Sequence, residues 1–369
     1  MTSLIPRRSR SLGAMTASLV DTLLTPHGID RYLELVDPMK VRNEIRGKVT
    51  AVRRQTADTV TLTVHTSKRW RGFRAGQYVR VSVDIDGVRR TRCYSPANSE
   101  LDPAGSLELT VKVDPHGLVS GHLYRNAAPG MILGLSQPDG EFTLPEPRPE
   151  QLLLVSGGSG ITPALSMLRT LHDRGDTDGV VFVHYANTEQ DVLYRDELAE
   201  LDRANPGLRV ALGFTHAEHG GDLHGFFTPA HLEEVAPNWR QAQTYLCGPD
   251  GLMDSVRALF YAEGLGEQLH TEVFTPPELE IDTENATGQV RFEHSGREIA
   301  NSGRPLLEQA EEAGLRPEHG CRMGICFSCT KVKSRGCVQN ALTGELSTEP
   351  EEEIQMCISV PVGDVDIYC

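Results

Sequence analysis

The sequence lacks three features that would each point to a particular class of protein. None of its apolar runs approaches the roughly 18 residues that a membrane-spanning helix needs. Basic residues are too few for a nucleic-acid-binding protein, since 36 Lys and Arg stand against 51 Asp and Glu, a net charge of −15. The eight cysteines do not suggest the disulfide framework of a secreted domain, which favours a reducing compartment. What remains is a globular composition, and 369 residues suffice for two or three domains.

Four of the eight cysteines have an informative spacing. Cys321, Cys326 and Cys329 lie in one short loop, and Cys357 follows farther along the chain. This is the C-x4-C-x2-C…C arrangement of plant-type [2Fe–2S] sites, in which four thiolates bind two irons. A zinc site is the first alternative, but zinc sites favour two separate cysteine pairs. Buried structural cysteines are the second alternative. The spacing therefore predicts an iron–sulfur cluster.

The sequence around these cysteines predicts a small domain of strands and one helix. Residues 288–299 are typical of two strands joined by a turn, and residues 364–368 alternate as a closing strand. Pro305 begins a short helix that Gly314 ends. This part of the chain resembles the plant-type ferredoxin domain. The resemblance implies a β-grasp fold over residues 285–369 and a role as a one-electron carrier.

The middle of the chain has the pattern of a nucleotide-binding domain. An apolar run at residues 151–156 is typical of a buried parallel strand, and a glycine-rich loop at 157–163 follows it directly. A strand, a glycine loop and a helix in this order place a pyrophosphate at the N-terminus of the helix. A glycine-rich turn alone would also suit an ordinary loop. Further strands alternate with helices, which predicts a doubly wound α/β domain over residues 148–276.

Two motifs in this region resemble the NAD(P)-binding domain of the ferredoxin–NADP reductase superfamily. They are GGSGITP, which starts at Gly157, and CGP, which starts at Cys247. The resemblance implies that the first motif binds the pyrophosphate and that Cys247 lies beside the nicotinamide, although a small buried residue is the alternative for Cys247. The nucleotide-binding residues it implies are Gly157, Gly158, Gly160, Thr162, Pro163, Cys247, Gly248 and Pro249.

The second predicted strand of the nucleotide-binding domain spans residues 179–185. The residues that follow it are expected to distinguish NADPH from NADH. Thr188 and Arg195 would suit a 2′-phosphate, whereas Glu189 would suit a free ribose hydroxyl. A resemblance to desaturase reductases, described below, favours NADPH, and NADH stays open.

Residues 46–147 contain short strands separated by turns, which predicts an antiparallel β-barrel. Arg-Cys-Tyr-Ser at 92–95 stands after one strand and resembles the R-x-Y-S flavin motif of the same superfamily, although so short a pattern also occurs by chance. Arg92 is suited to a flavin phosphate. Tyr94 is suited to stacking on the isoalloxazine ring, and Ser95 to a hydrogen bond near N5.

The resemblance implies further residues of the flavin site. An acidic residue and an aromatic residue lie against the flavin in relatives, and Glu272 and Phe274 match them. Ser95, Cys247 and Glu272 are therefore the candidate catalytic residues. The remaining candidate flavin contacts are Gln77, Tyr78, Lys112, Gly117, Val119 and Ser120. The short G-x-x-S element at 117–120 favours FAD, whereas some relatives with the same three-part organisation use FMN. A plain surface position is the alternative for Lys112.

Residues 1–45 precede the barrel, and we expect them to form a helical extension that packs against it. A twin-arginine export signal and a weak amphipathic surface anchor are the alternatives. Residues 277–284 are the predicted linker before the ferredoxin domain. Because the chain is expected to consume NAD(P)H, we expect a cytoplasmic location, and peripheral contact with the inner face of a membrane stays open.

The order of the three domains implies a path for electrons from NAD(P)H to FAD, then to the [2Fe–2S] cluster and out to a partner protein. Residues 24–38 resemble the extension of actinobacterial reductases that serve membrane stearoyl-CoA desaturases, which implies a di-iron desaturase as the acceptor. The alternatives are a soluble ring-hydroxylating oxygenase, an alkane hydroxylase or a cytochrome P450. An alternative of another class is a redox sensor that keeps the cofactors without turnover. Acidic residues at 349–353 would suit a basic partner, or simply form a solvated loop.

Overall fold

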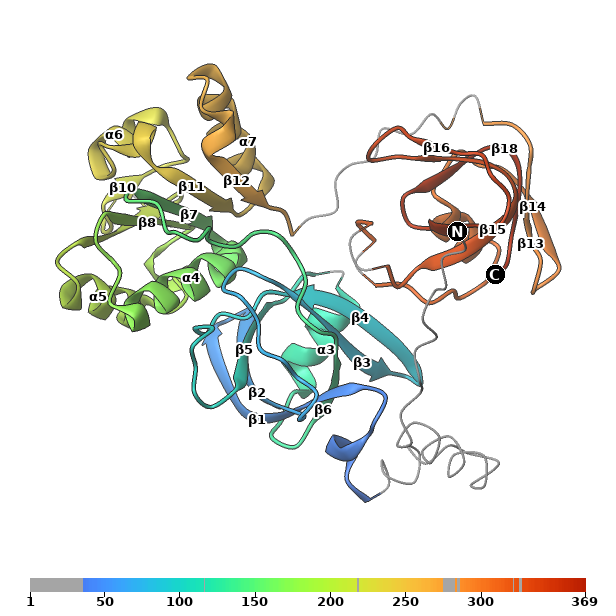
Figure 1. The fold of residues 1–369 in the computed structure, drawn as a ribbon, viewed down its shortest axis with the longest axis horizontal. Helices are drawn as coiled ribbons and strands as arrows, with labels where there is room; N and C mark the ends of the chain where they lie inside the picture. The colour runs from blue at the N-terminus through green and yellow to red at the C-terminus, as the bar shows by residue number, and fades with distance from the viewer. Residues whose placement is uncertain are drawn as a thin grey trace, which may run out of the picture.

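The protein forms three units, each with its own sheet, and Figure 1 shows them as three lobes of a computed structural model. The structure describes residues 36–115, 117–217, 219–274, 283, 286–320, 322–324 and 327–369. In this part of the chain, no helix is both long enough and apolar enough to cross a membrane.

The first unit is a curled antiparallel sheet with the strand order β4-β3-β6-β1-β2-β5. Alternate residues of β3 and β6 are buried inside the curl, where branched apolar side chains such as Val60, Leu62 and Val64 form the core. An isolated bridge between Pro96 and Leu109 brings the two sheet edges together. The elements are η1 (Pro38–Lys40), β1 (Ile45–Thr56), β2 (Thr59–Thr66), β3 (Val79–Ile85), β4 (Val88–Tyr94), β5 (Ser106–Lys112), α3 (Leu118–Asn126) and β6 (Ile132–Leu135).

The second unit is a parallel sheet with the order β10-β9-β8-β7-β11-β12 and helices on both faces. Its strands are β7 (Leu152–Gly157), β8 (Val180–Ala186), β9 (Leu208–Phe214), β10 (Leu223–His224), β11 (Gln243–Cys247) and β12 (Leu269–Glu272). Its helices are α4 (Ile161–Arg174), α5 (Arg195–Ala204), α6 (Pro229–Val235) and α7 (Asp250–Ala262), with short 3-10 turns η2 (Gly158–Gly160), η3 (Glu189–Asp191), η4 (Trp239–Gln241) and η5 (Gly266–Gln268). Each face of the sheet has its own hydrophobic core.

The order of these strands determines where a ligand can bind. β7 pairs with β8 on one side and with β11 on the other, so the connections from the centre of the sheet run in opposite directions. Ligands of open α/β sheets bind beyond the carboxyl ends of the strands at such a reversal. The loop after β7 contains the GGSG sequence, and the turn after β11 contains CGP. Both motifs therefore lie where this fold binds ligands.

The third unit is a mixed sheet with the order β14-β13-β18-β15-β16, and β17 also pairs with β15. Helix α8 packs Leu306 and Leu307 into the same core as Val290 and Phe292 of the sheet. The elements are β13 (Gln289–Phe292), β14 (Arg297–Ala300), α8 (Leu306–Glu312), β15 (Thr330–Asn340), β16 (Leu346–Ser347), β17 (Glu352–Gln355) and β18 (Ser359–Ile367).

A polar contact joins the first two units. The hydroxyl of Tyr194, which precedes α5, lies 3.3 Å from that of Thr61 in β2. The Arg169 guanidinium on α4 lies 4.8 Å from the centre of the Tyr194 ring. It also donates hydrogen bonds of 2.7 Å to Glu108 in β5 and 2.6 Å to Glu197 in α5. These bonds fix the curled sheet relative to the nucleotide unit.

The predicted fold class is confirmed in all three parts: a curled antiparallel sheet, a parallel α/β unit and a ferredoxin-like domain. Strand β1 begins at Ile45, one residue before the predicted start of the barrel. The predicted N-terminal extension and linker fall largely outside the described residues, and the domain boundaries stay a prediction. The Arg-Cys-Tyr-Ser motif does not follow a strand, because β4 includes its first three residues.

Candidate functional site

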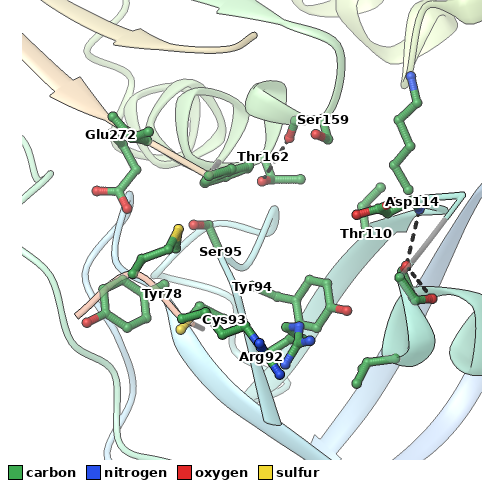
Figure 2. A pocket seen from close by; sticks show the side chains of 18 residues that line it. Tyr78, Arg92, Cys93, Tyr94, Ser95, Thr110, Asp114, Ser159, Thr162 and Glu272 are labelled. Carbon is green, nitrogen blue, oxygen red and sulfur yellow. Dashed lines mark hydrogen bonds between the residues drawn. The ribbon is translucent and has the colours of Figure 1, made fainter. Parts of the chain in front are cut away.

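A cavity of about 330 Å³ lies where the three units meet. Figure 2 shows side chains that point into it from the curled sheet and from the nucleotide unit. Its lining residues are Tyr78, Arg92, Cys93, Tyr94, Ser95, Thr110, Lys112, Asp114, Gly117, Val119, Ser120, Ser159, Thr162, Glu272, Val273, Phe274, Arg322 and Met323. The cavity therefore brings together most of the flavin residues predicted from the sequence.

Strand β4 supplies the central polar groups of the cavity. Ser95 follows the strand and is only 2% exposed, and among the described residues its hydroxyl has no hydrogen-bond partner. Leaving a buried hydroxyl unpaired is costly, so the group suits a ligand with a hydrogen-bonding atom. Tyr94 and Tyr78 also line the cavity, and burial raises the pKa of both phenols. Both phenols are therefore protonated at neutral pH.

Arg92 connects the cavity to the ferredoxin unit. Its guanidinium Nη1 donates a hydrogen bond of 2.6 Å to the carbonyl oxygen of Gly320 and another of 2.8 Å to that of Thr91. Gly320 begins the loop that contains the first three cysteines of the cluster motif. A neighbouring contact is similar, because Arg90 of β4 lies 3.5 Å from the His319 ring. Strand β4 therefore holds the cluster loop beside the cavity.

The start of helix α3 forms another wall of the cavity. Gly117, Val119 and Ser120 line it, together with Lys112 at the end of β5. The Ser120 hydroxyl donates a 3.3 Å hydrogen bond to the Gly117 carbonyl, which fixes the turn. Gln77 does not line the cavity, and its side-chain amide donates a 3.3 Å hydrogen bond to the Gly140 carbonyl.

The GGSG loop and the CGP turn pack directly against each other. A Cβ atom on Gly160 would lie 2.3 Å from the carbonyl oxygen of Cys247, and one on Gly157 would lie 2.8 Å from Cδ of Pro249. A larger side chain at Gly160 would require the backbone at Cys247 to move, and one at Gly157 would require the Pro249 and Leu252 side chains to move. Gly158 has a φ of +52° and open space beside it, so its backbone is accessible to a ligand. This arrangement suits a pyrophosphate near the start of α4.

The other predicted residues of this motif lie close by. Thr162 lines the cavity, and its hydroxyl donates a 3.3 Å hydrogen bond to the carbonyl of Ser159. Pro163 is buried within the first turn of α4. Gly248 lies against Gly157, with 3.1 Å between a Cβ built on Gly248 and the Gly157 nitrogen.

Cys247 and Glu272 are paired across β11 and β12. Glu272 lines the cavity, and burial raises the pKa of its carboxyl to about 7. Cys247 is buried in the core between the sheet and α4, and it is not among the residues that line the cavity. Burial also raises the pKa of its thiol, so the thiol is protonated at neutral pH. Phe274 lines the cavity and remains 37% exposed.

The predicted coenzyme-selecting residues lie beyond β8, apart from the cavity. The Thr188 hydroxyl donates a 2.8 Å hydrogen bond to Asp191 and so belongs to the capping of η3. The Arg195 guanidinium lies 2.9 Å from the Glu189 carboxylate, and both side chains are about half exposed. The candidate cation and the candidate acid are therefore partners of one another.

Two of the four predicted cluster ligands are described by the structure. Cys329 and Cys357 are buried in the core of the ferredoxin unit, and the Met356 amide donates a 3.2 Å hydrogen bond to the Cys329 carbonyl. Cys321 and Cys326 lie outside the described residues. Two buried thiols on separate segments are the donor type that an iron–sulfur cluster needs.

Sequence reasoning missed several residues of the cavity. Arg322 and Met323 belong to the cluster loop, yet they line the flavin side of the cavity. Both residues lie inside the C-x4-C motif, so the motif could have indicated that they are part of the site. Ser159 lies within the glycine motif, where its position next to Gly160 was also a signal. Thr110 and Asp114 belong to no recognisable motif, and they reach the cavity because the sheet curls.

Comparisons with known proteins agree with this geometry. The Oxidoreductase FAD-binding domain family matches residues 46–144, and the Oxidoreductase NAD-binding domain family matches residues 154–258. The 2Fe-2S iron-sulfur cluster binding domain family matches residues 290–362. The chain is thus an oxidoreductase with a flavin domain, a nicotinamide domain and an iron–sulfur domain.

Relatives that match most of the chain indicate which kind of oxidoreductase it resembles. The chain is 36% identical to an NADPH oxidoreductase of Mycobacterium tuberculosis, over 94% of this chain and 90% of the relative. It is 32% identical to a glycine betaine monooxygenase reductase subunit of Pseudomonas aeruginosa, over 80% of this chain and 87% of the relative. The solved structure of phthalate dioxygenase reductase matches with a TM-score of 0.61 and 25% identity, over 89% of this chain and 98% of that one.

The chain belongs to the ferredoxin–NADP reductase superfamily, in the group whose members carry a C-terminal [2Fe–2S] domain. It is an NAD(P)H-dependent oxidoreductase with FAD and a [2Fe–2S] cluster as cofactors. The unpaired Ser95 hydroxyl, the open backbone at Gly158 and the buried thiols of Cys329 and Cys357 fit these groups.

Proposed function

We propose that the protein carries electrons from NADPH to the iron centre of a partner enzyme that activates O₂. The observation that supports this most directly is a cavity lined by all three units, with Ser95 from the curled sheet, Glu272 from the nucleotide unit and Arg322 from the cluster loop. When bound, FAD converts the two-electron chemistry of NADPH into single-electron steps, and the cluster carries one electron at a time.

Each wall of the cavity has a distinct task in this proposal. Ser95 would donate a hydrogen bond near the reactive edge of the flavin ring, and Tyr94 would stack on the ring. Arg92 and the start of α3 would hold the phosphates. Glu272 would hold a proton at its carboxyl near neutral pH, since burial raises its pKa to about 7. Cys247 would pack beside the nicotinamide as a neutral thiol.

NADPH is the proposed electron donor. Arg195 is a cation that a 2′-phosphate could recruit, and its exposed pairing with Glu189 contributes little free energy, so a phosphate can displace the carboxylate. The Mycobacterium tuberculosis relative, which aligns with nearly the whole chain, is itself named an NADPH oxidoreductase.

The proposed acceptor is a membrane di-iron fatty acyl desaturase. Residues 24–38 resemble the extension of reductases that serve such desaturases. The match to the mycobacterial NADPH oxidoreductase spans 94% of this chain, so it includes at least about half of residues 1–45. The glycine betaine monooxygenase reductase subunit matches only 80% of the chain. The N-terminal segment shared with the mycobacterial relative lies outside the three cofactor domains, which suits a role in binding a particular partner protein. The proposed place of that contact is the cytoplasmic face of a membrane.

The second candidate is the reductase of a soluble oxygenase, and relatives with named partners favour it. They include reductase components of a glycine betaine monooxygenase and a propane 2-monooxygenase. A cytochrome P450 reductase is among the similar solved structures, at 28% identity and a TM-score of 0.57. An alkane hydroxylase would need electrons in the same single steps.

Reconstitution tests the function and the acceptor separately. The holoenzyme should oxidise NADPH and reduce cytochrome c, whereas a redox sensor would hold its cofactors without turnover. With membranes that contain a stearoyl-CoA desaturase, the holoenzyme should then support desaturation faster than an unrelated flavin and iron–sulfur reductase at equal cytochrome c activity. Equal desaturation rates for the two reductases would remove the desaturase proposal and leave the oxygenases.

A further inference from the structure

The cluster loop faces two separate cavities. Arg322 and Met323, near its start, line the cavity shared with the flavin domain. Phe327 and Thr330, near its end, line a second cavity of about 490 Å³ on the ferredoxin unit, and the two cavities share no lining residue. The cluster loop therefore contributes to two distinct surfaces, one toward the flavin cavity and one away from it.

Exposed apolar side chains lie at this second cavity and beside the cluster loop. Phe327 is 61% exposed and Leu346 is 59% exposed, and both line it. Leu342 is 43% exposed and lies against the cluster loop, since a Cβ on Gly324 would be 3.2 Å from its Cδ1 atom. We call Phe327, Leu342 and Leu346 the exit patch. Apolar side chains gathered in this way are typical of surfaces that bind another protein.

The backbone at Phe327 adopts a strained conformation, and its ring is exposed. Its φ is +54°, a left-handed value that bulky residues rarely adopt. Such strain is found where the surrounding structure enforces it, often at functional positions. Phe327 also lies between Cys326 and Cys329 in the sequence, two of the cysteines of the cluster motif.

Acidic side chains form the rim of the exit patch. Glu345, Glu352 and Glu353 line the same cavity. Glu352 pairs with the buried Lys333 at 3.5 Å, whereas Glu345 and Glu353 are exposed. Among the described residues, no ion pair involves either of these two carboxylates. The side of the loop toward the flavin differs in charge, because basic side chains (Arg90, Arg92 and Arg322) lie there beside acidic ones such as Glu272.

We propose that the exit patch and its acidic rim are the docking surface for the electron-accepting partner, with Phe327 at the centre of the contact. The partner should present an apolar centre ringed by Lys and Arg above its redox iron, because such a surface complements both the patch and the rim. In this contact the reduced cluster would lose one electron, and one ferric iron of the partner would gain it and become ferrous. This inference rests on the proposed function.

The test uses the holoenzyme with cytochrome c, a basic haem protein, as the probe acceptor. Phe327→Ala and Leu346→Ser should each lower the second-order rate constant of cytochrome c reduction by about three- to tenfold. The double variant Glu345→Gln/Glu353→Gln should lower it at low salt and flatten its dependence on ionic strength. Reduction of the bound flavin by NADPH, followed by stopped flow, should keep its rate in all of these variants.

Matched controls make each outcome decisive. Val362→Ala changes a residue that is 50% exposed on the same unit but does not line this cavity, and Glu234→Gln/Glu267→Gln removes two exposed charges from the nucleotide unit. Both controls should behave like wild type. The visible and electron paramagnetic resonance spectra of the cluster show whether Phe327→Ala retains it, and Leu346→Ser tests the patch from outside the cluster loop.

The proposal is overturned if the exit-patch and rim variants reduce cytochrome c as fast as the controls while their clusters are intact. It is also overturned if sedimentation shows a dimer that Phe327→Ala dissociates, because a second copy of the chain would then occupy the patch. Failure of the proposed function looks different, since wild type itself would then reduce no cytochrome c.

Discussion

Arg92 and Gly320 are joined by a hydrogen bond of 2.6 Å, although they lie in different domains. Arg92 stands in the flavin motif at the end of β4, and Gly320 directly precedes the cluster motif. The same guanidinium lines the flavin cavity, and arginine can serve two acceptors because it has five donor N–H groups in a planar fork. The flavin site and the cluster loop are therefore coupled through one side chain.

Replacing Arg92 should weaken FAD binding and also slow electron transfer from the flavin to the cluster. Arg92→Ala is expected to weaken FAD binding by about 10- to 100-fold, because a charge-assisted hydrogen bond contributes roughly 1.5–3 kcal/mol. It should also slow electron transfer from flavin to cluster in enzyme reconstituted with excess FAD. Arg92→Lys keeps the charge but loses the fork, so it should bind FAD with intermediate affinity. Fluorescence titration of the apoprotein and stopped-flow absorbance measure the two effects.

Arg89→Ala is the control for this prediction. Arg89 lies on the same strand, but it pairs with Glu44 at 3.2 Å and does not line the cavity. It should bind FAD like wild type. Unchanged FAD affinity in Arg92→Ala would contradict the assignment of Arg92 to the flavin.

Ser95→Ala should slow flavin reduction by NADPH without lowering the stability of the apoprotein. The Ser95 hydroxyl is buried, and within the described part of the chain it has no partner, so removing it should leave the free energy of unfolding of the apoprotein unchanged or raise it by about 1 kcal/mol. In the holoenzyme the variant should slow flavin reduction by NADPH about 10-fold or more, through the loss of a hydrogen bond to the flavin. Denaturant titration and stopped flow measure these two quantities.

Thr244→Val provides the comparison. Thr244 is fully buried in β11, and its hydroxyl also has no partner among the described residues, but it does not line the cavity. This variant should gain stability in the same way and reduce its flavin at the wild-type rate. If Ser95→Ala also kept the wild-type rate, Ser95 would have no role in reduction.

Local motifs made much of this site predictable. Arg92, Tyr94 and Ser95 reach the cavity because one strand end carries all three, and the glycines of the GGSG loop meet the CGP turn because both motifs follow adjacent parallel strands. In each case the chemistry is contained in a few consecutive residues. The strand and helix pattern then determines where those residues lie.

Contacts between distant segments were not predictable in the same way. The bond from Arg92 to Gly320 depends on how two domains dock, and nothing in either local sequence specifies that. The Tyr194 hydroxyl meets Thr61 across a domain interface for the same reason. Thr188 was expected to face a 2′-phosphate, but its hydroxyl bonds to Asp191, three residues away, in the cap of η3. Capping competes with ligand binding for the same hydroxyl.

Coenzyme preference should depend on the ion pair between Glu189 and Arg195. Arg195→Ala should raise KM for NADPH about 10-fold and leave KM for NADH nearly unchanged, because only NADPH carries the 2′-phosphate. Glu189→Gln should lower KM for NADPH, since it removes the nearer carboxylate partner of Arg195, at 2.9 Å, and leaves Asp196 at 3.6 Å. Steady-state kinetics with both coenzymes give the comparison, and Arg209→Ala, which removes an exposed arginine paired with Asp222, is the control. Equal effects on the two coenzymes would show that Arg195 does not contact the phosphate.

Glu272 should give the protein a pH dependence near neutrality. Burial raises the pKa of its carboxyl from 4.5 to about 7 in the folded protein. Between these two values the folded state holds a proton that the unfolded state has released, so this group makes the free energy of unfolding fall as pH rises from about 4.5 to 7. Glu272→Gln removes this effect. The variant should therefore gain stability relative to wild type across that window, and the gain should stay constant above it.

The same ionisation should appear in turnover. Only the protonated carboxyl can donate a proton or a hydrogen bond into the cavity, so cytochrome c reduction by wild type should fall as pH rises through about 7. Glu272→Gln should be slower at pH 6 and should lack this step in its pH profile. Glu267→Gln, an exposed change on the same unit, should keep the wild-type profile in both measurements. A step near pH 7 that survives in Glu272→Gln would assign the ionisation to another group.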